Sequence, residues 1–297
     1  MNIESISNYF RELLIMDCNR FLKTYGWTGE LTRDFDKTLL NYFAFKDIFD
    51  KSKKKWKCIE NPELSFSEDI QNGYDNLKQA LVSGENLDKY MSKGIFRGEN
   101  DPMFNDWGIL HFHLGNELET SNKFVKRTGE LAFVRFHKDS AYIIAIGKHG
   151  DWTKQALVAT LHKYWRYTLE SSLNNLMTTS HDLTDYELSK LRESNINVPL
   201  IMDDGEVYML LNGGLSTAGN RTAHSHSLIE ITNSLTCMAE YIVKSNIFHD
   251  VLNLFPYCFR LTDTFWGLQT TGIAFRSLRT KKYLSCIAGV VKYEEDL

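Results

Sequence analysis

The spacing of apolar residues changes at about residue 105, and this change constrains the fold more than any other feature of the sequence. In residues 1–50 and 67–92, apolar side chains recur every three or four positions, which is typical of amphipathic helices. Residues 105–115, 131–136 and 142–146 are instead rich in β-branched and aromatic residues, which is typical of strands. Separate helical and β-rich regions predict a fold of the α+β class.

The β-rich region continues into a helix, and a second mixed region follows. Residues 151–167 have apolar side chains at helical spacing behind Asp151, which can cap a helix. Further on, Asp204-Gly205 lies between two short apolar runs and predicts a hairpin. A helix is expected from Thr222 to Val243, with a buried stripe of Ile229, Leu235, Met238 and Ile242. Three regions are expected: a helical N-terminal region at 1–100, a central small antiparallel sheet with a helix at 101–185, and an α+β C-terminal extension at 186–297.

Composition excludes several classes of protein. No apolar run approaches the roughly 18–20 residues that a membrane span needs, so no membrane association is expected. The five cysteines are an odd number with no Cys-x-x-Cys pair, which suits reduced thiols in the cytoplasm. The net charge of -4 does not favour nucleic acid for the chain as a whole, although a local basic face is compatible with it.

His111 and His113 form the most informative motif. Because alternate residues of a strand point to the same side, we expect both to point to one face of a strand and to line a cleft. One interpretation is structural, with two half-exposed imidazoles on an apolar strand. A second is a metal site completed by a third ligand such as His149 or Asp151. A third is metal-free acid and base catalysis, in which one imidazole deprotonates a ribose 2′-hydroxyl and the other protonates the leaving oxygen.

Other polar residues near this strand favour an anionic substrate. His149 and Lys148 end a neighbouring strand, and Arg127 precedes another, so we expect all three beside the histidine pair as catalytic groups. Arg135 and Lys154 are expected to bind the substrate phosphate. Histidine, lysine and arginine with few carboxylates suit a phosphate better than a hard metal, so neither a metal nor another cofactor is expected.

The segments 105–115, 127–134, 141–153 and 157–165 resemble a widespread family of uncharacterised bacterial and prophage proteins. The shared features are a DWGIHHFHLG-like block, an RTG-x-L-L-F strand and a tyrosine-bearing strand that ends in a histidine. The resemblance covers about residues 50–166 and departs at Leu110, where the family often has a further histidine. The arrangement of two strands and a helix is similar to the RelE-type ribonuclease toxins at the level of the fold.

A second motif lies further along the chain. Arg221 and His226 have the Arg-x4-His spacing that resembles the motif of HEPN-type ribonucleases, which implies that both side chains face an RNA phosphate. The alternative is a polar helix start capped by Asn220 or Thr222.

The sequence thus predicts a cytoplasmic, nuclease-like or toxin-like protein that cleaves RNA by histidine chemistry without a metal, in defence against phage. Its partner would be RNA or another nucleic acid. The alternative is a non-catalytic binding or assembly subunit of a multi-protein complex, with structural histidines and a protein partner. A metal-dependent hydrolase that uses His111 and His113 is a third interpretation.

Overall fold

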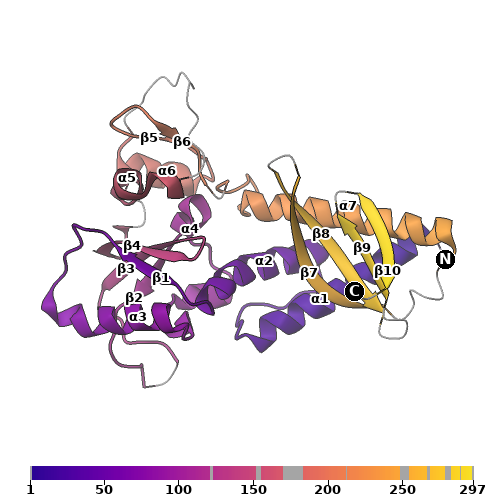
Figure 1. Cartoon of the computed structure of the whole chain (residues 1–297), viewed down its shortest axis with the longest axis horizontal. Coiled ribbons are helices and arrows are strands. Elements are labelled where there is room, and N and C mark those ends of the chain that lie inside the picture. The colour runs from indigo at the N-terminus through magenta and orange to yellow at the C-terminus, as the bar shows by residue number, and fades with distance from the viewer. Residues whose placement is uncertain are drawn as a thin grey trace. The chain divides into compact units, whose positions relative to one another are not determined.

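A computed structural model shows how the chain folds (Figure 1). It describes residues 2–120, 123–151, 155–169, 183–211, 213–247, 254–265, 268–277, 282–287 and 289–295. The fold is of the α+β class, with a helical N-terminus, as predicted. Among the described helices, none combines the length and the apolar character that crossing a membrane requires.

The chain divides into two compact units. Their limits differ from the region boundaries at residues 100 and 185 that the sequence predicts. A central unit comprises Phe45–Ala223, and a terminal unit combines Met1–Ala44 with His224–Leu297. The difference has a physical reason. Patterns along a sequence mark where the type of element changes, whereas a compact unit is set by which apolar faces pack together, and here the two ends of the chain share one core.

The terminal unit packs helices against an antiparallel sheet. It contains α1 (Ile3–Thr24), the first part of α2 (Phe35–Ser52), most of α7 (Thr222–Ser245), and the strands β7 (Leu254–Phe265), β8 (Leu268–Ser277), β9 (Lys282–Ile287) and β10 (Val290–Glu295). The strand order is β10-β9-β8-β7, with each strand antiparallel to its neighbour. Figure 1 shows α1 and α7 alongside this sheet, and side chains of the helices and of β8 and β9 form its core.

Helix α7 confirms the long helix that the sequence predicts, with one correction in its buried stripe. Leu235, Met238 and Ile242 are fully buried, as expected for a face turned to the core. Ile229 is 59% exposed, so its inclusion in that stripe was wrong. The buried residue at the start of the stripe is Ile231, which lies four positions before Leu235 and therefore shares its face.

The central unit is built on a mixed four-stranded sheet. Its strands are β1 (Lys57–Glu60), β2 (Ile109–His113), β3 (Glu130–His137) and β4 (Ser140–Lys148), in the order β1-β4-β3-β2. The β2-β3 and β3-β4 pairs are antiparallel, as predicted, and β1 joins β4 in parallel. The helices are α3 (Gln71–Ser83), α4 (Pro102–Trp107), α5 (Gln155–Trp165) and α6 (Asp185–Glu193), with 3₁₀ turns at Glu68–Ile70, Leu87–Tyr90, Lys93–Arg97 and Arg166–Thr168.

One face of this sheet packs against α5. Leu131 and Phe133 of β3 share a core with Val158 and Leu161 of the helix. The hairpin of β5 (Leu200–Ile201) and β6 (Val207–Tyr208), which turns at Asp204-Gly205 as predicted, contributes Tyr208 to the same core. The hairpin is therefore held against α5 by apolar packing.

The expected strand at 105–115 is shorter than the sequence suggested. Residues 105–107 end helix α4, and the strand starts only at Ile109. Asp101 caps the helix by accepting a hydrogen bond from the backbone N–H of Phe104 (3.0 Å), and Pro102 stands in its first turn. Gly108 then takes a left-handed conformation (φ 66°), which ends the helix and allows β2 to begin.

Candidate functional site

Strands β2 and β4 bring three imidazoles together at one end of the sheet. His111 and His113 lie on the same face of β2, as predicted, and their ring centroids are 6.1 Å apart. His149 follows the end of β4, with centroid distances of 6.3 Å to His111 and 5.5 Å to His113. Because β3 pairs with both strands, it fixes the separation of the three rings. We call His111, His113 and His149 the histidine cluster.

The three imidazoles differ in burial. His113 is only 2% exposed, and neither of its ring nitrogens has a hydrogen-bond partner among the described residues. Burial, together with the charge of Arg127, lowers its pKa to about 4, so this ring is neutral at pH 7. The expectation that His111 and His113 would line a cleft together does not hold for His113, because this side chain is buried.

His111 and His149 are the two members of the cluster that reach the surface. The His111 side chain is 12% exposed, and its Nδ1 lies 3.1 Å from Oδ2 of Asp101, the residue that caps α4. His149 is exposed, and its pKa is lowered by partial burial and by the neighbouring charges of His111 and Arg127. A carboxylate beside one imidazole and a cation beside the other give the two rings different environments.

The structure also brings Arg127 to the cluster. Its side chain is exposed, and its charge acts on both His113 and His149. Lys148, at the end of β4, is exposed as well, and its backbone N–H donates to Oδ2 of Asp151 (2.8 Å). None of the interactions described for Lys148 involves the three imidazoles, so Arg127 is the cation that the structure places with them.

Two arginines that the sequence predicts to bind substrate are buried with internal partners. The Arg135 guanidinium donates from Nε and Nη2 to the carbonyl of Thr168 (3.2 and 2.7 Å), and from Nη1 to the carbonyl of Trp107. Arg221 pairs with Asp47 (2.9 Å) and lies over the ring of Phe104. Both are 8% exposed, so these contacts give them structural positions in the central unit.

The remaining predicted residues contribute no phosphate-binding geometry. The side chain of His226 is 64% exposed and lies 3.5 Å from Glu230, one turn further along α7. Arg221 is paired with Asp47 and His226 lies beside Glu230, so each residue of the Arg-x4-His motif has a carboxylate next to it. Lys154 lies outside the described residues.

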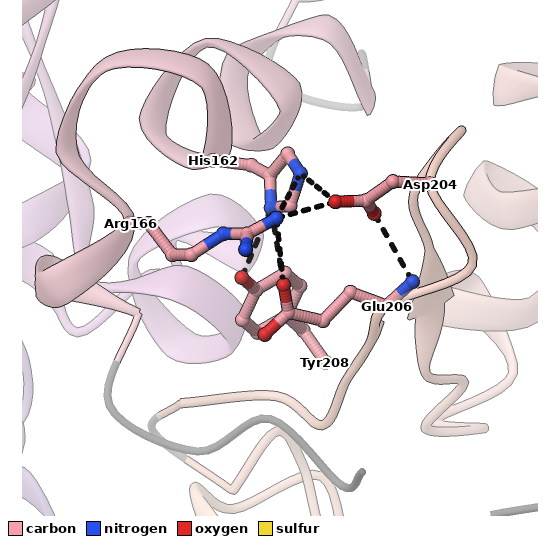
Figure 2. Close-up of polar contacts among 5 residues, drawn as sticks. All are labelled: His162, Arg166, Asp204, Glu206 and Tyr208. Carbon is pink, nitrogen blue, oxygen red and sulfur yellow. Dashed lines mark hydrogen bonds and ion pairs between the residues drawn. The ribbon is translucent and has the colours of Figure 1, made fainter. Parts of the chain in front are cut away.

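A second polar cluster was not predicted. His162 and Arg166, one turn apart on α5 and the 3₁₀ turn that follows, meet Asp204, Glu206 and Tyr208 of the β5-β6 hairpin (Figure 2). The Arg166 side chain binds the carboxylates of Asp204 and of Glu206 (2.8 Å). We call these five residues the hairpin cluster, and a cavity of about 710 Å³ opens beside His162, Arg166 and Asp204.

The sequence contained two signals for the hairpin cluster. Asp204, Glu206 and Tyr208 alternate, as residues on one face of a strand do, and His162 and Arg166 have the i, i+4 spacing of one helix face. Taken alone, the residues around Asp204 are typical of a turn, and His162 is typical of a histidine in a helical core. Some forty residues separate the two segments in the sequence. Only the packing of the hairpin against α5 brings them together.

The metal interpretation of His111 and His113 has less geometric support than the hairpin cluster. Within the part of the chain that the structure describes, the set whose ligand atoms all lie within 4.8 Å of one another is His162, Asp204 and Glu206. The histidine cluster is not such a set.

Comparison of the chain with protein-family models, with curated proteins and with solved structures found no match. The resemblance of residues 50–166 to bacterial and prophage proteins therefore stays a prediction. The function of the chain is inferred from the geometry of its residues.

Proposed function

We propose that the protein is a nuclease-like, toxin-like enzyme that cleaves RNA by metal-independent acid–base chemistry at the histidine cluster. The observation that carries the proposal is the convergence of His111 and His149, from two strands of one sheet, beside the charge of Arg127. Two imidazoles and a cation around one point match the two proton transfers and the charge stabilisation that phosphodiester cleavage needs.

The surroundings of His111 and His149 support a different role for each ring. His149, with a pKa below its usual range, is neutral at pH 7 and can take the proton of a ribose 2′-hydroxyl. The 2′-oxygen then bonds to phosphorus, the bond from phosphorus to the 5′-oxygen breaks, and His111 donates a proton to that leaving oxygen. Asp101 balances the positive charge of the His111 imidazolium before this transfer.

Arg127 and His113 support the chemistry of the two catalytic imidazoles. Arg127 balances the negative charge that develops on the phosphoryl oxygens. His113 is buried beneath the site, so it shapes the position of the other two rings and does not touch the substrate. The proposal keeps the acid–base chemistry expected from the sequence and transfers one of the two roles from His113 to His149.

The experiment uses the purified chain with a short RNA and with the same oligomer carrying a single 2′-deoxyribose at the cleaved position, both in EDTA. We expect cleavage of the RNA to a 2′,3′-cyclic phosphate and no cleavage at the deoxy position. His111→Ala and His149→Ala should each lower the rate by about 10²–10⁴-fold. His226→Ala is the matched control, because it removes an exposed histidine outside the cluster. Intact RNA under every condition would contradict the proposal.

The setting of this activity is also proposed. The four cysteines whose side chains the structure describes form no disulfide with one another, which supports the cytoplasm. A role in defence against phage is supported by the resemblance to prophage proteins alone.

The alternative function is a non-catalytic binding or assembly subunit with a protein partner. It is favoured by the buried position of His113 and by the internal contacts of Arg135 and Arg221, since these three residues act within the fold. In that case His111→Ala and His149→Ala would leave the biological activity of the chain unchanged. The third interpretation, a metal-dependent hydrolase at His111 and His113, requires that EDTA abolish cleavage.

A further inference from the structure

Three atoms with lone pairs surround one point in the hairpin cluster. Nε2 of His162 lies 3.1 Å from Oδ2 of Asp204, and Oε2 of Glu206 approaches from the other side (Figure 2). Two ligands at about 2.1 Å from one octahedral ion stand about 3 Å apart, which matches the first of these distances. Two carboxylates and an imidazole nitrogen thus surround one point. Because their lone pairs repel one another, a cation at that point stabilises the arrangement.

The hydrogen bonds of His162 and Tyr208 indicate which nitrogen faces that point. Tyr208 forms a side-chain hydrogen bond with Glu206, and because a carboxylate can only accept, the phenol is the donor. The phenol oxygen then accepts from Nδ1 of His162 (3.0 Å). With its proton on Nδ1, the imidazole directs the lone pair of Nε2 to the centre of the cluster. Second-shell partners orient metal-binding histidines in this way.

Arg166 now fills the centre. Its Nη2 lies 3.0 Å from Nε2 of His162 and 2.8 Å from Oε2 of Glu206, and it also binds Asp204. The side chain is 53% exposed, so its ion pairs are of the weak, surface kind and it can leave at low cost. A metal ion at the position of Nη2 would draw each ligand atom inward by less than about 1 Å.

We propose that His162, Asp204 and Glu206 form a binding site for one divalent cation that accepts nitrogen and oxygen ligands, such as Zn²⁺ or Mn²⁺, and that Arg166 is the internal cation which the metal displaces. One imidazole and two carboxylates suit this class of ion better than Mg²⁺ or Ca²⁺, which prefer oxygen alone. The site is separate from the histidine cluster and independent of the proposed RNA cleavage.

The site opens to solvent on one side. His162 and Asp204 line the cavity of about 710 Å³ beside α5, which provides the path for an ion to enter. Three protein ligands leave coordination positions of such an ion unfilled, so water or an anionic ligand in the cavity can complete its shell.

The test measures binding of Zn²⁺ and of Mn²⁺ separately, by isothermal titration calorimetry on the full chain after treatment with chelator. We expect one ion per chain. His162→Ala, Asp204→Asn and Glu206→Gln should each weaken binding by at least about tenfold, and Tyr208→Phe by about 10–100-fold, because the phenyl ring cannot orient His162. Arg166→Ala should tighten binding about fivefold or more, since it removes the competing cation.

Two control variants separate this site from adventitious binding. Asp203→Asn changes an acid that lines the same cavity outside the three ligands, and His226→Ala removes an exposed histidine beside Glu230; neither should change the affinity. Asp204→Asn alters a half-exposed turn residue, so loss of binding in this variant with an unchanged thermal unfolding curve reports on the site itself. The proposal is overturned if Arg166→Ala binds neither metal, or if the ligand variants bind as the wild type does.

Discussion

His113 illustrates how one buried residue can make stability depend on pH. In the unfolded chain its pKa returns to about 6.5, whereas in the folded chain it is about 4, so the unfolded state binds the extra proton first. The stabilisation is complete above about pH 6.5 and is lost as the pH falls toward 4. In urea unfolding, we expect the wild type to lose up to about 3 kcal/mol over that window. The His113→Leu variant should not show the loss of unfolding free energy that His113 causes. If the unfolding free energies of wild type and variant depend equally on pH, this explanation is wrong.

Arg135 supports a second prediction at the residue scale. Its guanidinium is buried and satisfies the carbonyls of Thr168 and Trp107, so Arg135→Met leaves both acceptors without these donors. We expect a loss of about 2–4 kcal/mol in the free energy of unfolding. RNA cleavage per folded molecule should stay unchanged. A selective loss of RNA affinity in a stable variant would instead restore the substrate-binding role that the sequence suggested.

At the scale of elements, helix α4 couples the local fold to the histidine cluster through Asp101. The residue caps α4 through Oδ1 and lies beside Nδ1 of His111 through Oδ2. Asparagine caps a helix as well as aspartate does but carries no charge, so Asp101→Asn should keep the stability and lower the rate of RNA cleavage. Asp101→Ala should lose about 1 kcal/mol of stability in addition. Thermal unfolding and the cleavage assay, applied to both variants, separate the two roles, and equal activity of Asp101→Asn and wild type would refute the second.

At the scale of the whole molecule, the two ends of the chain depend on each other for one core. Phe10 of α1 is fully buried, and its ring centroid is 4.4 Å from that of Phe275 in β8. We expect Phe10→Ala to destabilise the terminal unit by about 3–5 kcal/mol in urea unfolding, because a large cavity is left in a packed core. Met16→Ala on the same helix is the control, since Met16 is 66% exposed and should change stability little. Similar unfolding of the two variants would argue against a shared core.

Local periodicity in the sequence determined several features without reference to the fold. The alternation around His111 and His113 predicted one strand face, Asp204-Gly205 predicted the hairpin, and the apolar spacing predicted α7. These predictions succeeded because each depends on residues within about twenty positions of one another, where backbone geometry alone sets which side chains share a face. Placing His149 beside His111 needed two strand pairings, because β3 lies between β2 and β4 and pairs with both.

Contacts between distant segments were decided by the tertiary structure. The sequence predicts that both Arg127 and Arg135 act on the substrate. In the structure Arg127 is exposed, whereas Arg135 is buried and donates to carbonyls of α4 and of the 3₁₀ turn after α5. The sequence likewise separates His162 from Asp204 by some forty residues, and only apolar packing of the hairpin on α5 joins them. The physical reason is that periodicity reports which face of an element is apolar, whereas the partner of that face is chosen by the packing of the whole chain.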